Sequence, residues 1–461
     1  MPGMNDVTEA VTATPLPIPI APGRLPVLGH MLPMIRRPHE FLCSLTKIGP
    51  LVRVDIGGQS MIVVTDATLT RQVLKNNKAF DKGGALYDKA RDLVGAGLLT
   101  SQAQDHLRQR RMLQPVFHQH RIKNHAAIMS EVIESVLGEW QDGAVTNITE
   151  TAYKITSYSA ARTMFAAQIA AQDVARIVEA LLVYLQGMFV RMIAPDTIRP
   201  LLTMHDNARY KQAVHTLHAS VDKIIAAYQA SGTDHCDLLS MLLVARDDDG
   251  SPLTAQEIRD QVISMFVAGI ETTASVISWS LYLVGRHPDV ASNFYSEVDT
   301  VLDGRAAQWD DLAQLNETKR IITESLRIYP PGWIFTRVTM QPVMLGEYHL
   351  PQGTGLAYSP YLLHRSPEIF EQPERFDPDR WLPQRMANVS LDGFVPFGGG
   401  VHKCIGDNFG VTEATLALAT IASRWTLQPT QSQPVQPVPR RAVLAPGPIP
   451  MRICRRKHAV Q

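Results

Sequence analysis

Phe397-Gly398-Gly399-Gly400-Val401-His402-Lys403-Cys404-Ile405-Gly406 is the stretch of this chain that decides its fold. It places one cysteine in a glycine-rich loop directly before an apolar helical segment. Glycine has no Cβ and tolerates positive φ, so the backbone here can come unusually close to another group. A sulfur at the start of a helix meets free N–H groups and the positive end of the helix dipole, and both favour the thiolate form.

Two uses of this loop are open. A lone, stabilised thiolate is the ligand that a haem iron needs when it activates dioxygen, and the alternative is a buried structural cysteine beside a glycine turn. The spacing F-x-x-G-x-[R/H]-x-C-x-G resembles the cysteine-ligand loop of the cytochrome P-450 family of haem-thiolate monooxygenases. The resemblance implies Cys404 as the axial ligand of iron in haem b, with Phe397 and Gly406 also at the cofactor. It further implies the triangular helical prism of that family, which is mainly α with a minor β lobe.

Composition excludes several other classes of protein. Lys+Arg and Asp+Glu are both 44, so the formal net charge is +0, which argues against general binding of nucleic acid or anionic membranes. The four cysteines are sparse and unpatterned, which fits a reducing compartment and offers no zinc-site spacing. The first 22 residues are rich in Pro, Thr and Ala and contain no apolar stretch near the roughly 18 residues of a membrane span. We expect a cytoplasmic monomer without a membrane anchor.

The 461 residues exceed the usual size of one domain, but no linker or repeat period interrupts them. We therefore predict a flexible N-terminal segment over residues 1–21 and a single domain over residues 22–461. Alternating apolar residues around Gly57-Gly58 predict a β-hairpin over residues 51–65.

Helices are expected over most of residues 68–279 and again near the C-terminus. The capping-box sequence Thr254-Ala255-Gln256-Glu257 and the absence of proline before Pro288 predict one long buried helix over residues 255–286. Two further helices are predicted over residues 317–329, where Pro330-Pro331 follows, and over residues 408–425.

The long helix contains Ala268-Gly269-Ile270-Glu271-Thr272-Thr273. A carboxylate and two hydroxyls in mid-helix lower helix propensity, and a threonine there can bond back to the i−4 carbonyl. The stretch resembles the family's A-G-x-[D/E]-T-T motif. The resemblance implies that Ala268 and Gly269 let the flat cofactor lie close, that Thr272 hydrogen-bonds the oxygen being activated, and that Glu271 brings protons from solvent. The alternative is that Thr272 merely satisfies itself on a carbonyl.

Glu324 and Arg327 lie three residues apart and therefore share a helix face. Such a pair alone carries no signal, because solvated pairs at this spacing are common. With Pro373-Glu374-Arg375-Phe376 farther on, the order resembles the family's buried Glu–Arg–Arg cluster. The resemblance implies a structural cluster of Glu324, Arg327 and Arg375 that holds the cysteine loop in register.

A haem also brings two propionates, which need partners if they leave water. His106 and Arg110 lie four residues apart and match the H-x-x-x-R variant of the family's propionate motif. Arg337 and His402 occupy two other familiar propionate positions, and His402 stands where arginine is more frequent. The alternative for these residues is a basic, solvated surface around Arg108.

The same basic stretch has a second possible use. Together with Arg121, Lys123 and Lys403 it could dock an acidic iron–sulfur protein on the cysteine side of the haem. No flavin or ferredoxin module follows the haem domain in the sequence. We therefore expect electrons from NAD(P)H through an external ferredoxin and ferredoxin reductase, with dioxygen as co-substrate.

Residues at the family's substrate-facing positions carry almost no charge, so the resemblance implies an apolar substrate, although each of them could equally be plain core packing. They are Leu181, Leu185, Phe189, Met265, Phe266, Trp333 and Ile334. Segments such as Ala79-Phe80-Asp81-Lys82-Gly83-Gly84 resemble actinobacterial terpene hydroxylases, which implies hydroxylation of a terpene. The alternatives are the same chemistry on a polyketide, fatty acid or steroid, or a haem protein that is not an oxygenase, such as a sensor or an isomerase.

Overall fold

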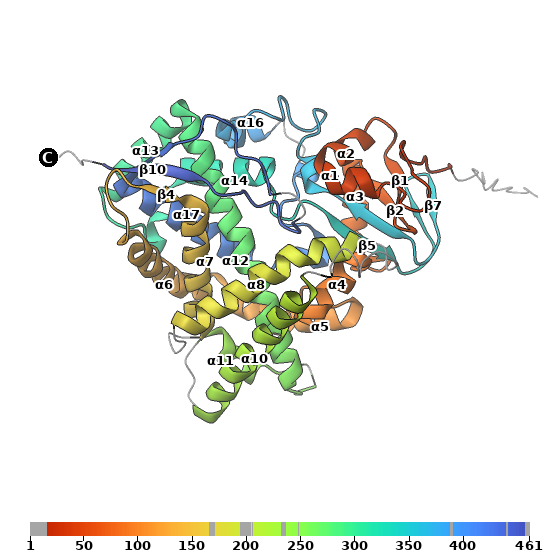
Figure 1. The fold of residues 1–461 in the computed structure, drawn as a ribbon, viewed down its shortest axis with the longest axis horizontal. Helices are drawn as coiled ribbons and strands as arrows, with labels where there is room; N and C mark the ends of the chain where they lie inside the picture. Colours follow the sequence, from red (N-terminus) through yellow and green to blue (C-terminus); the bar gives the residue numbers. More distant parts are fainter. Residues whose placement is uncertain are drawn as a thin grey trace, which may run out of the picture.

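The computed structural model describes residues 16–165, 171–193, 204, 206–231, 237–247, 249–387, 391–438 and 441–456. Figure 1 shows a body of packed helices with a roughly triangular outline, and a small sheet with α1, α2 and α3 at one corner. The predicted class, mainly α with a minor β lobe, is confirmed. The helices are α1 (Met31–Arg36), α2 (Pro38–Leu45), α3 (Ala67–Lys75), α4 (Ala85–Val94), α5 (Ala103–Leu113), α6 (Gln119–Leu137), α7 (Ile148–Phe165), α8 (Ala171–Ile193), α10 (Asn207–Ser231), α11 (Leu238–Val244), α12 (Ala255–Arg286), α13 (Pro288–Leu302), α14 (Asn316–Ile328), α15 (Pro360–Leu363), α16 (Pro383–Met386) and α17 (Asp407–Arg424).

The β lobe is built on the predicted hairpin. Strands β1 (Leu51–Ile56) and β2 (Gln59–Val64) pair antiparallel, with Ile56 opposite Gln59 across the Gly57-Gly58 turn. The sheet continues in the order β1-β2-β8-β5-β3, with β8 (Gly355–Tyr358), β5 (Phe335–Thr339) and β3 (Phe80–Asp81). Two smaller sheets have the orders β4-β10-β9 and β6-β7, formed by β4 (Val145–Asn147), β10 (Pro450–Arg455), β9 (Trp425–Pro429), β6 (Val343–Leu345) and β7 (Tyr348–Leu350).

The N-terminal boundary lies earlier than the sequence predicted. Arg53 in β1 donates its backbone N–H to the carbonyl of Pro19 at 2.8 Å, and Ala21 donates to the carbonyl of Arg53 at 2.9 Å. Residues 19–21 are thus part of the folded body, because backbone hydrogen bonds to a buried strand hold them. The predicted flexible segment over residues 1–21 is wrong for these residues, and residues 1–15 lie outside the described part of the chain.

Helix α12 runs through the middle of the molecule (Figure 1), and its bounds match the prediction. Thr254 accepts from the backbone of Glu257, and the Glu257 carboxylate accepts in turn from the backbone of Thr254, so both halves of the capping box form. By length and composition α12 could cross a membrane, but 78% of its most apolar window is buried inside the fold. It is therefore the core helix of this domain.

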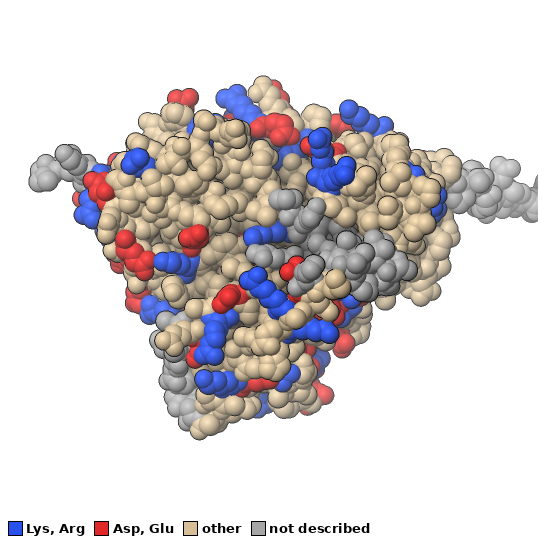
Figure 2. Space-filling view, in the orientation of Figure 1, with Lys and Arg blue, Asp and Glu red and all other residues tan. Residues whose placement is uncertain are grey.

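Helices α14 and α17 pack against α12 and form one core with α6, α7 and α13. Both agree with the predicted ranges, 317–329 and 408–425, to within one residue at each end. The surface carries no single block of charge on the face drawn in Figure 2, where basic and acidic side chains are interspersed. This agrees with the balanced composition.

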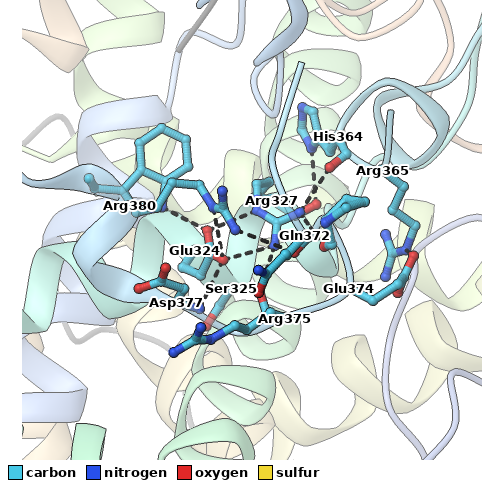
Figure 3. A network of polar contacts seen from close by, with 12 residues as sticks. Glu324, Ser325, Arg327, His364, Arg365, Gln372, Glu374, Arg375, Asp377 and Arg380 are labelled. Atoms are coloured by element: carbon cyan, nitrogen blue, oxygen red, sulfur yellow. Dashed lines mark hydrogen bonds and ion pairs between the residues drawn. The ribbon is translucent and has the colours of Figure 1, made fainter. Parts of the chain in front are cut away.

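A buried ion pair between Glu324 and Arg327 lies at the centre of a polar network (Figure 3). Arg327 donates from Nε and Nη2 to the two carboxylate oxygens of Glu324 at 2.9 and 2.8 Å, and both side chains are 0% exposed. Arg327 Nη1 also donates to the carbonyl of His364 at 2.9 Å, and His364 Nε2 accepts from the backbone N–H of Val395 at 3.0 Å. Because Val395 lies two residues before Phe397, the network fixes the start of the loop.

The predicted third member of this cluster is corrected. Arg375 is exposed and contributes only its backbone carbonyl, which accepts from Arg327 at 3.1 Å. The second guanidinium belongs to the buried Arg380, whose Nε lies 3.5 Å from Glu324 Oε1 (Figure 3). Trp381 also donates its indole N–H to Glu324 at 2.8 Å. The signal was in the sequence, because Pro378-Asp379-Arg380-Trp381 repeats the pattern of Pro373-Glu374-Arg375-Phe376 five residues later.

Replacing Arg380 by alanine is expected to lower the free energy of unfolding by about 1–3 kcal/mol. This is less than the roughly 3–5 kcal/mol of a fully unpaired buried charge, because Arg327 still faces Glu324. Arg375→Ala is the matched control and should change stability by less than about 0.5 kcal/mol, since alanine keeps the carbonyl. Urea unfolding followed by tryptophan fluorescence measures both values. Equal losses of stability in the two variants would show that the side chain of Arg375 does belong to the Glu324 cluster.

Candidate active site

The loop before α17 folds tightly around Cys404. The backbone N–H of Cys404 donates to the carbonyl of Phe397 at 2.9 Å, which closes the loop on itself. Gly400 has a φ of +63°, and a Cβ at this position would lie 1.9 Å from the backbone oxygen of Leu74 in α3. Only glycine fits there, so α3 and the loop are fixed against each other by backbone contact.

Cys404 has an exposed surface, yet burial is the largest influence on its thiol and raises its pKa. The two observations agree if the residue faces a recess inside the fold. The N–H of Gly406 and the charges of Arg110 and Lys403 lower the pKa without reversing the shift. The expectation that the helix start favours the thiolate is therefore only partly met, because α17 begins three residues later, at Asp407. Bonding to a metal ion would deprotonate such a thiol.

One face of α12 is open although the helix lies in the core. Ala268 is exposed and Met265, Gly269 and Thr272 are partly exposed, whereas their neighbours Phe266 and Ile270 are buried. These positions recur at spacings of three and four residues and so share one face. A Cβ built on Gly269 would meet no atom within 4 Å. The open face leaves room for a flat group such as haem, and contact of Ala268 and Gly269 with the cofactor stays a prediction.

The hydroxyl of Thr272 donates to the carbonyl of Ala268, four residues earlier. The sequence left this arrangement open as an alternative, in which the hydroxyl forms its hydrogen bond with a backbone carbonyl of its own helix. The hydroxyl oxygen keeps its lone pairs, and the side chain lies on the open face of α12. Thr272 can therefore accept a hydrogen bond there at once, and it can donate one only by releasing Ala268.

Glu271 is 1% exposed and is held by two side chains from distant parts of the chain. Tyr153 in α7 donates its hydroxyl to Glu271 Oε1 at 3.2 Å, and Arg441 Nη1 lies 3.4 Å from the same oxygen. Burial raises the pKa of Glu271, and the Arg441 charge acts against that rise. The side chain of Arg441 is partly exposed, and its contact with Glu271 was not indicated by the sequence motifs.

The four predicted propionate residues lie in one region around Asp81 and Lys82, but they are not equivalent. Arg110 donates to the backbone carbonyl of Lys403 at 2.5 Å. Arg337 is 3% exposed. Its polar partners among the described residues are the hydroxyls of Tyr87 and Tyr358 at 3.1 and 3.4 Å and a backbone carbonyl, with no carboxylate among them.

The two histidines are already engaged. His402 Nε2 lies 3.0 Å from Asp81 Oδ1, while its buried Nδ1 has no partner among the described residues. Both ring nitrogens of His106 have partners, Lys82 Nζ at 3.1 Å and the carbonyl of Val401 at 3.2 Å. A buried guanidinium without a carboxylate and an unpartnered ring nitrogen fit a group that brings carboxylates, as haem does.

The predicted substrate residues divide between two cores. Leu181, Leu185 and Phe266 are buried in one cluster, with Met265 packed against it. Trp333 and Ile334 belong to the core of the β lobe, where the indole N–H of Trp333 donates to the carbonyl of Arg441 at 3.2 Å. The side chain of Phe189 lies outside the described part of the chain. Substrate contact therefore stays a prediction for all six described side chains.

Comparisons with known proteins agree with this geometry. The family model described as cytochrome P-450 matches residues 19–454. Pentalenene oxygenase of Streptomyces avermitilis is 42% identical over 95% of this chain and 97% of its own length. Cyclooctatin synthase of Streptomyces melanosporofaciens is 41% identical over 94% of each chain.

Solved structures give the same result for the fold. The haem domain of cytochrome P-450DA superimposes with a TM-score of 0.86 at 26% identity, covering 96% of this chain and 98% of that one. The family match spans the cysteine loop, the open face of α12 and the Glu324 network alike. The chain belongs to the cytochrome P-450 family of haem monooxygenases.

Proposed function

We propose that this protein hydroxylates an unactivated C–H bond of a terpene, using dioxygen and two electrons from an external ferredoxin. The observation that carries the substrate class is the similarity, at 41–42% identity over almost the whole chain, to relatives named a pentalenene oxygenase and a cyclooctatin synthase. The uncharged side chains of Leu181, Leu185, Met265 and Phe266 support an apolar ligand.

Haem, when bound, supplies the activation of dioxygen and the insertion of one oxygen atom into the C–H bond. Cys404 would hold the iron, with Phe397 and Gly406 shaping the loop around it. Arg110, Arg337 and His402 would hold the propionates. Ala268 and Gly269 would form the wall against the macrocycle. The apolar residues facing this space would exclude water.

Two residues would handle protons in this proposal. Thr272 lies on the open face of α12, where its hydroxyl can accept from a water and donate in turn once the Ala268 bond opens. Glu271 lies on the adjoining, buried side of the same helix, next to Tyr153 and Arg441. We propose that protons pass from the Arg441 side to Glu271 and that Thr272 positions them at the oxygen.

Electrons would come from NAD(P)H through a ferredoxin reductase and a ferredoxin that docks on the cysteine side. Arg121 and Lys403 would contribute basic side chains to this docking surface. Lys123 would contribute too, because its pair with Asp310 at 3.0 Å is a solvent-exposed contact that a partner could replace. We also propose a monomer in the cytoplasm. Cys43, Cys404 and Cys454 are free, as expected in a reducing compartment.

Cys404→Ser is expected to abolish the red-displaced Soret band that the reduced protein gives with carbon monoxide, because that band depends on a thiolate bonded to iron. Cys43→Ser is the control, since Cys43 is half-buried in α2 and far along the chain from the loop. It should keep the band. Absorption spectra of the reduced, carbon-monoxide-treated proteins decide the matter. A serine variant with an unchanged band would contradict the proposed iron ligand.

Thr272→Ala should uncouple NADPH consumption from hydroxylation, because the hydroxyl that positions protons is lost. We expect product per NADPH to fall by about 100-fold while hydrogen peroxide rises. Thr272→Ser keeps the hydroxyl and should stay within a few-fold of the wild type. Thr273→Ala, at the buried neighbouring position, is a second control. Unchanged coupling in Thr272→Ala would leave the hydroxyl with its bond to Ala268 as its only role.

Adding terpene hydrocarbons to the oxidised, haem-loaded protein should shift the Soret band to shorter wavelength, because an apolar ligand beside the open face of α12 would exclude water from the cofactor. Fatty acids, steroids and polyketide lactones serve as competing classes. If only one of these competing classes shifted the Soret band, the substrate would be assigned to that class instead of to the terpenes. Product formed from the terpene should require NADPH, ferredoxin and its reductase together, and turnover without electrons would indicate an isomerase.

A further inference from the structure

A phenol on α7 reaches the buried acid of α12. Tyr153 lies in the first half of α7, and its ring packs against both helical cores. Its hydroxyl donates to Glu271 Oε1 at 3.2 Å. Burial, followed by the charge of Glu271, raises the pKa of the Tyr153 phenol, so the hydroxyl keeps its proton and serves as a donor to the carboxylate. The sequence motifs mark Glu271 and Thr272 but no residue of α7.

The two oxygens of the Glu271 carboxyl group have different surroundings. Oε1 accepts from the hydroxyl of Tyr153 and also from Arg441 Nη1, which lies 3.4 Å away. Oε2 is buried and has no partner among the described residues. A guanidinium can only donate, so it cannot accept a hydrogen bond from a protonated Oε1. When Glu271 carries a proton, that proton is therefore placed on Oε2, where no donor competes with it.

Of the two partners of Oε1, Tyr153 is the more firmly placed. Helices α7 and α12 pack along each other, and the phenol ring lies where the two cores meet. Arg441 belongs instead to an irregular segment near the C-terminus, and part of its side chain is exposed. A group carried on a helix keeps its geometry better than one carried on a loop. Tyr153 is thus suited to fix the orientation of the Glu271 carboxyl group.

Both partners also favour the ionised form of Glu271. Burial raises the pKa of its carboxyl group, and the charge of Arg441 and the hydrogen bond from Tyr153 act against that rise. These two side chains are the ionisable groups that influence Glu271 among the described residues. Removing the Tyr153 hydroxyl would take one donor from the carboxylate. The ionised form would then lose stabilisation, and the pKa of Glu271 would rise further.

We propose that Tyr153 is a positioning residue for proton delivery, because by occupying Oε1 of Glu271 it places the transferable proton on Oε2. This inference rests on the proposed haem monooxygenase function and deepens its proton path. In the delivery step the Oε2–H bond breaks, the proton passes toward Thr272, and the carboxylate takes up another proton from solvent. Tyr153 keeps its own proton throughout, so it acts through Glu271 and not as an acid itself.

The first test measures the protonation of Glu271 without turnover. Infrared spectra of the haem-loaded protein are recorded across a pH series, and the band of the protonated carboxyl group is assigned by its loss in Glu271→Gln. Tyr153→Phe removes only the hydroxyl and should move the midpoint of this band upward by about one pH unit. Tyr158→Phe, on the same helix, is the matched control and should leave the midpoint unchanged. An unchanged midpoint in Tyr153→Phe would refute the proposal.

The second test asks whether the hydroxyl acts through Glu271, with the terpene hydrocarbon that shifts the Soret band as substrate. Tyr153→Phe should lower product per NADPH by about tenfold and raise the solvent deuterium isotope effect, while KM stays unchanged. In a Glu271→Gln background the same substitution should cause no further loss of coupling, because the acid that it positions is gone. An equal loss of coupling in both backgrounds would show a structural role and overturn the proposal.

The carbon monoxide spectrum of each variant is read in parallel. If the wild type lacks the red-displaced band, the proposed function itself fails, while the infrared midpoints still test the action of Tyr153 on Glu271. If the band is normal and neither the midpoint nor the coupling changes in Tyr153→Phe, only this inference fails.

Discussion

A carboxylate and a guanidinium without any exposed surface, Glu324 and Arg327, hold together the part of the molecule that presents the cysteine. Taking both charges out of water is favourable only because each is fully hydrogen-bonded. Arg327 also bonds the carbonyls of His364, Pro373 and Arg375, and so it gathers a long irregular segment onto α14. The cysteine loop needs such support, because a glycine-rich loop has little tendency of its own to keep one conformation.

The support is passed on through His364. Its ring donates to the carbonyl of Arg327 and accepts from the N–H of Val395, and burial with the charge of Arg327 lowers its pKa to about 3. A neutral ring with one donor and one acceptor suits this bridge. From Val395 the chain enters the loop, where Gly400 lies against the backbone of Leu74. One continuous set of contacts therefore runs from the ion pair in α14 to Cys404.

Helix α12 serves two purposes with two faces. From Thr273 to Val284 it is buried on every side and forms the core with α7, α14 and α17. Around Ala268 one face is open, and Glu271 and Thr272 lie in this part of the helix. Glu271 and Thr272 are neighbours in sequence, but the helical turn of about 100° per residue puts one against Tyr153 and Arg441 and the other on the open face. Acid and hydroxyl are thus held in different surroundings a short distance apart.

Electrostatics at the sheet edge complement this arrangement. Near Cys404 the protein itself raises the thiol pKa by burial, and the buried cations Lys82 and Arg337 lack a matching number of carboxylates among the described residues. Both features suit a cofactor that brings a metal ion for the sulfur and carboxylates for the cations. Haem would therefore supply both the metal ion that the Cys404 sulfur can bind and the carboxylates that the buried cations can pair with.

The sequence by itself determined the features that depend on neighbouring residues. The capping box and the missing prolines set the bounds of α12, the alternation around Gly57-Gly58 set the hairpin, and the spacing of the cysteine loop indicated the family. Only the tertiary structure decided which distant side chains meet. Arg375 and Arg380 lie in two similar stretches five residues apart, so either could have paired with Glu324. Packing of the folded chain buries the Arg380 side chain beside Glu324 and leaves that of Arg375 exposed. The burial of Lys82 and the contact of Arg441 with Glu271 were decided in the same way, because both join residues that lie far apart along the chain.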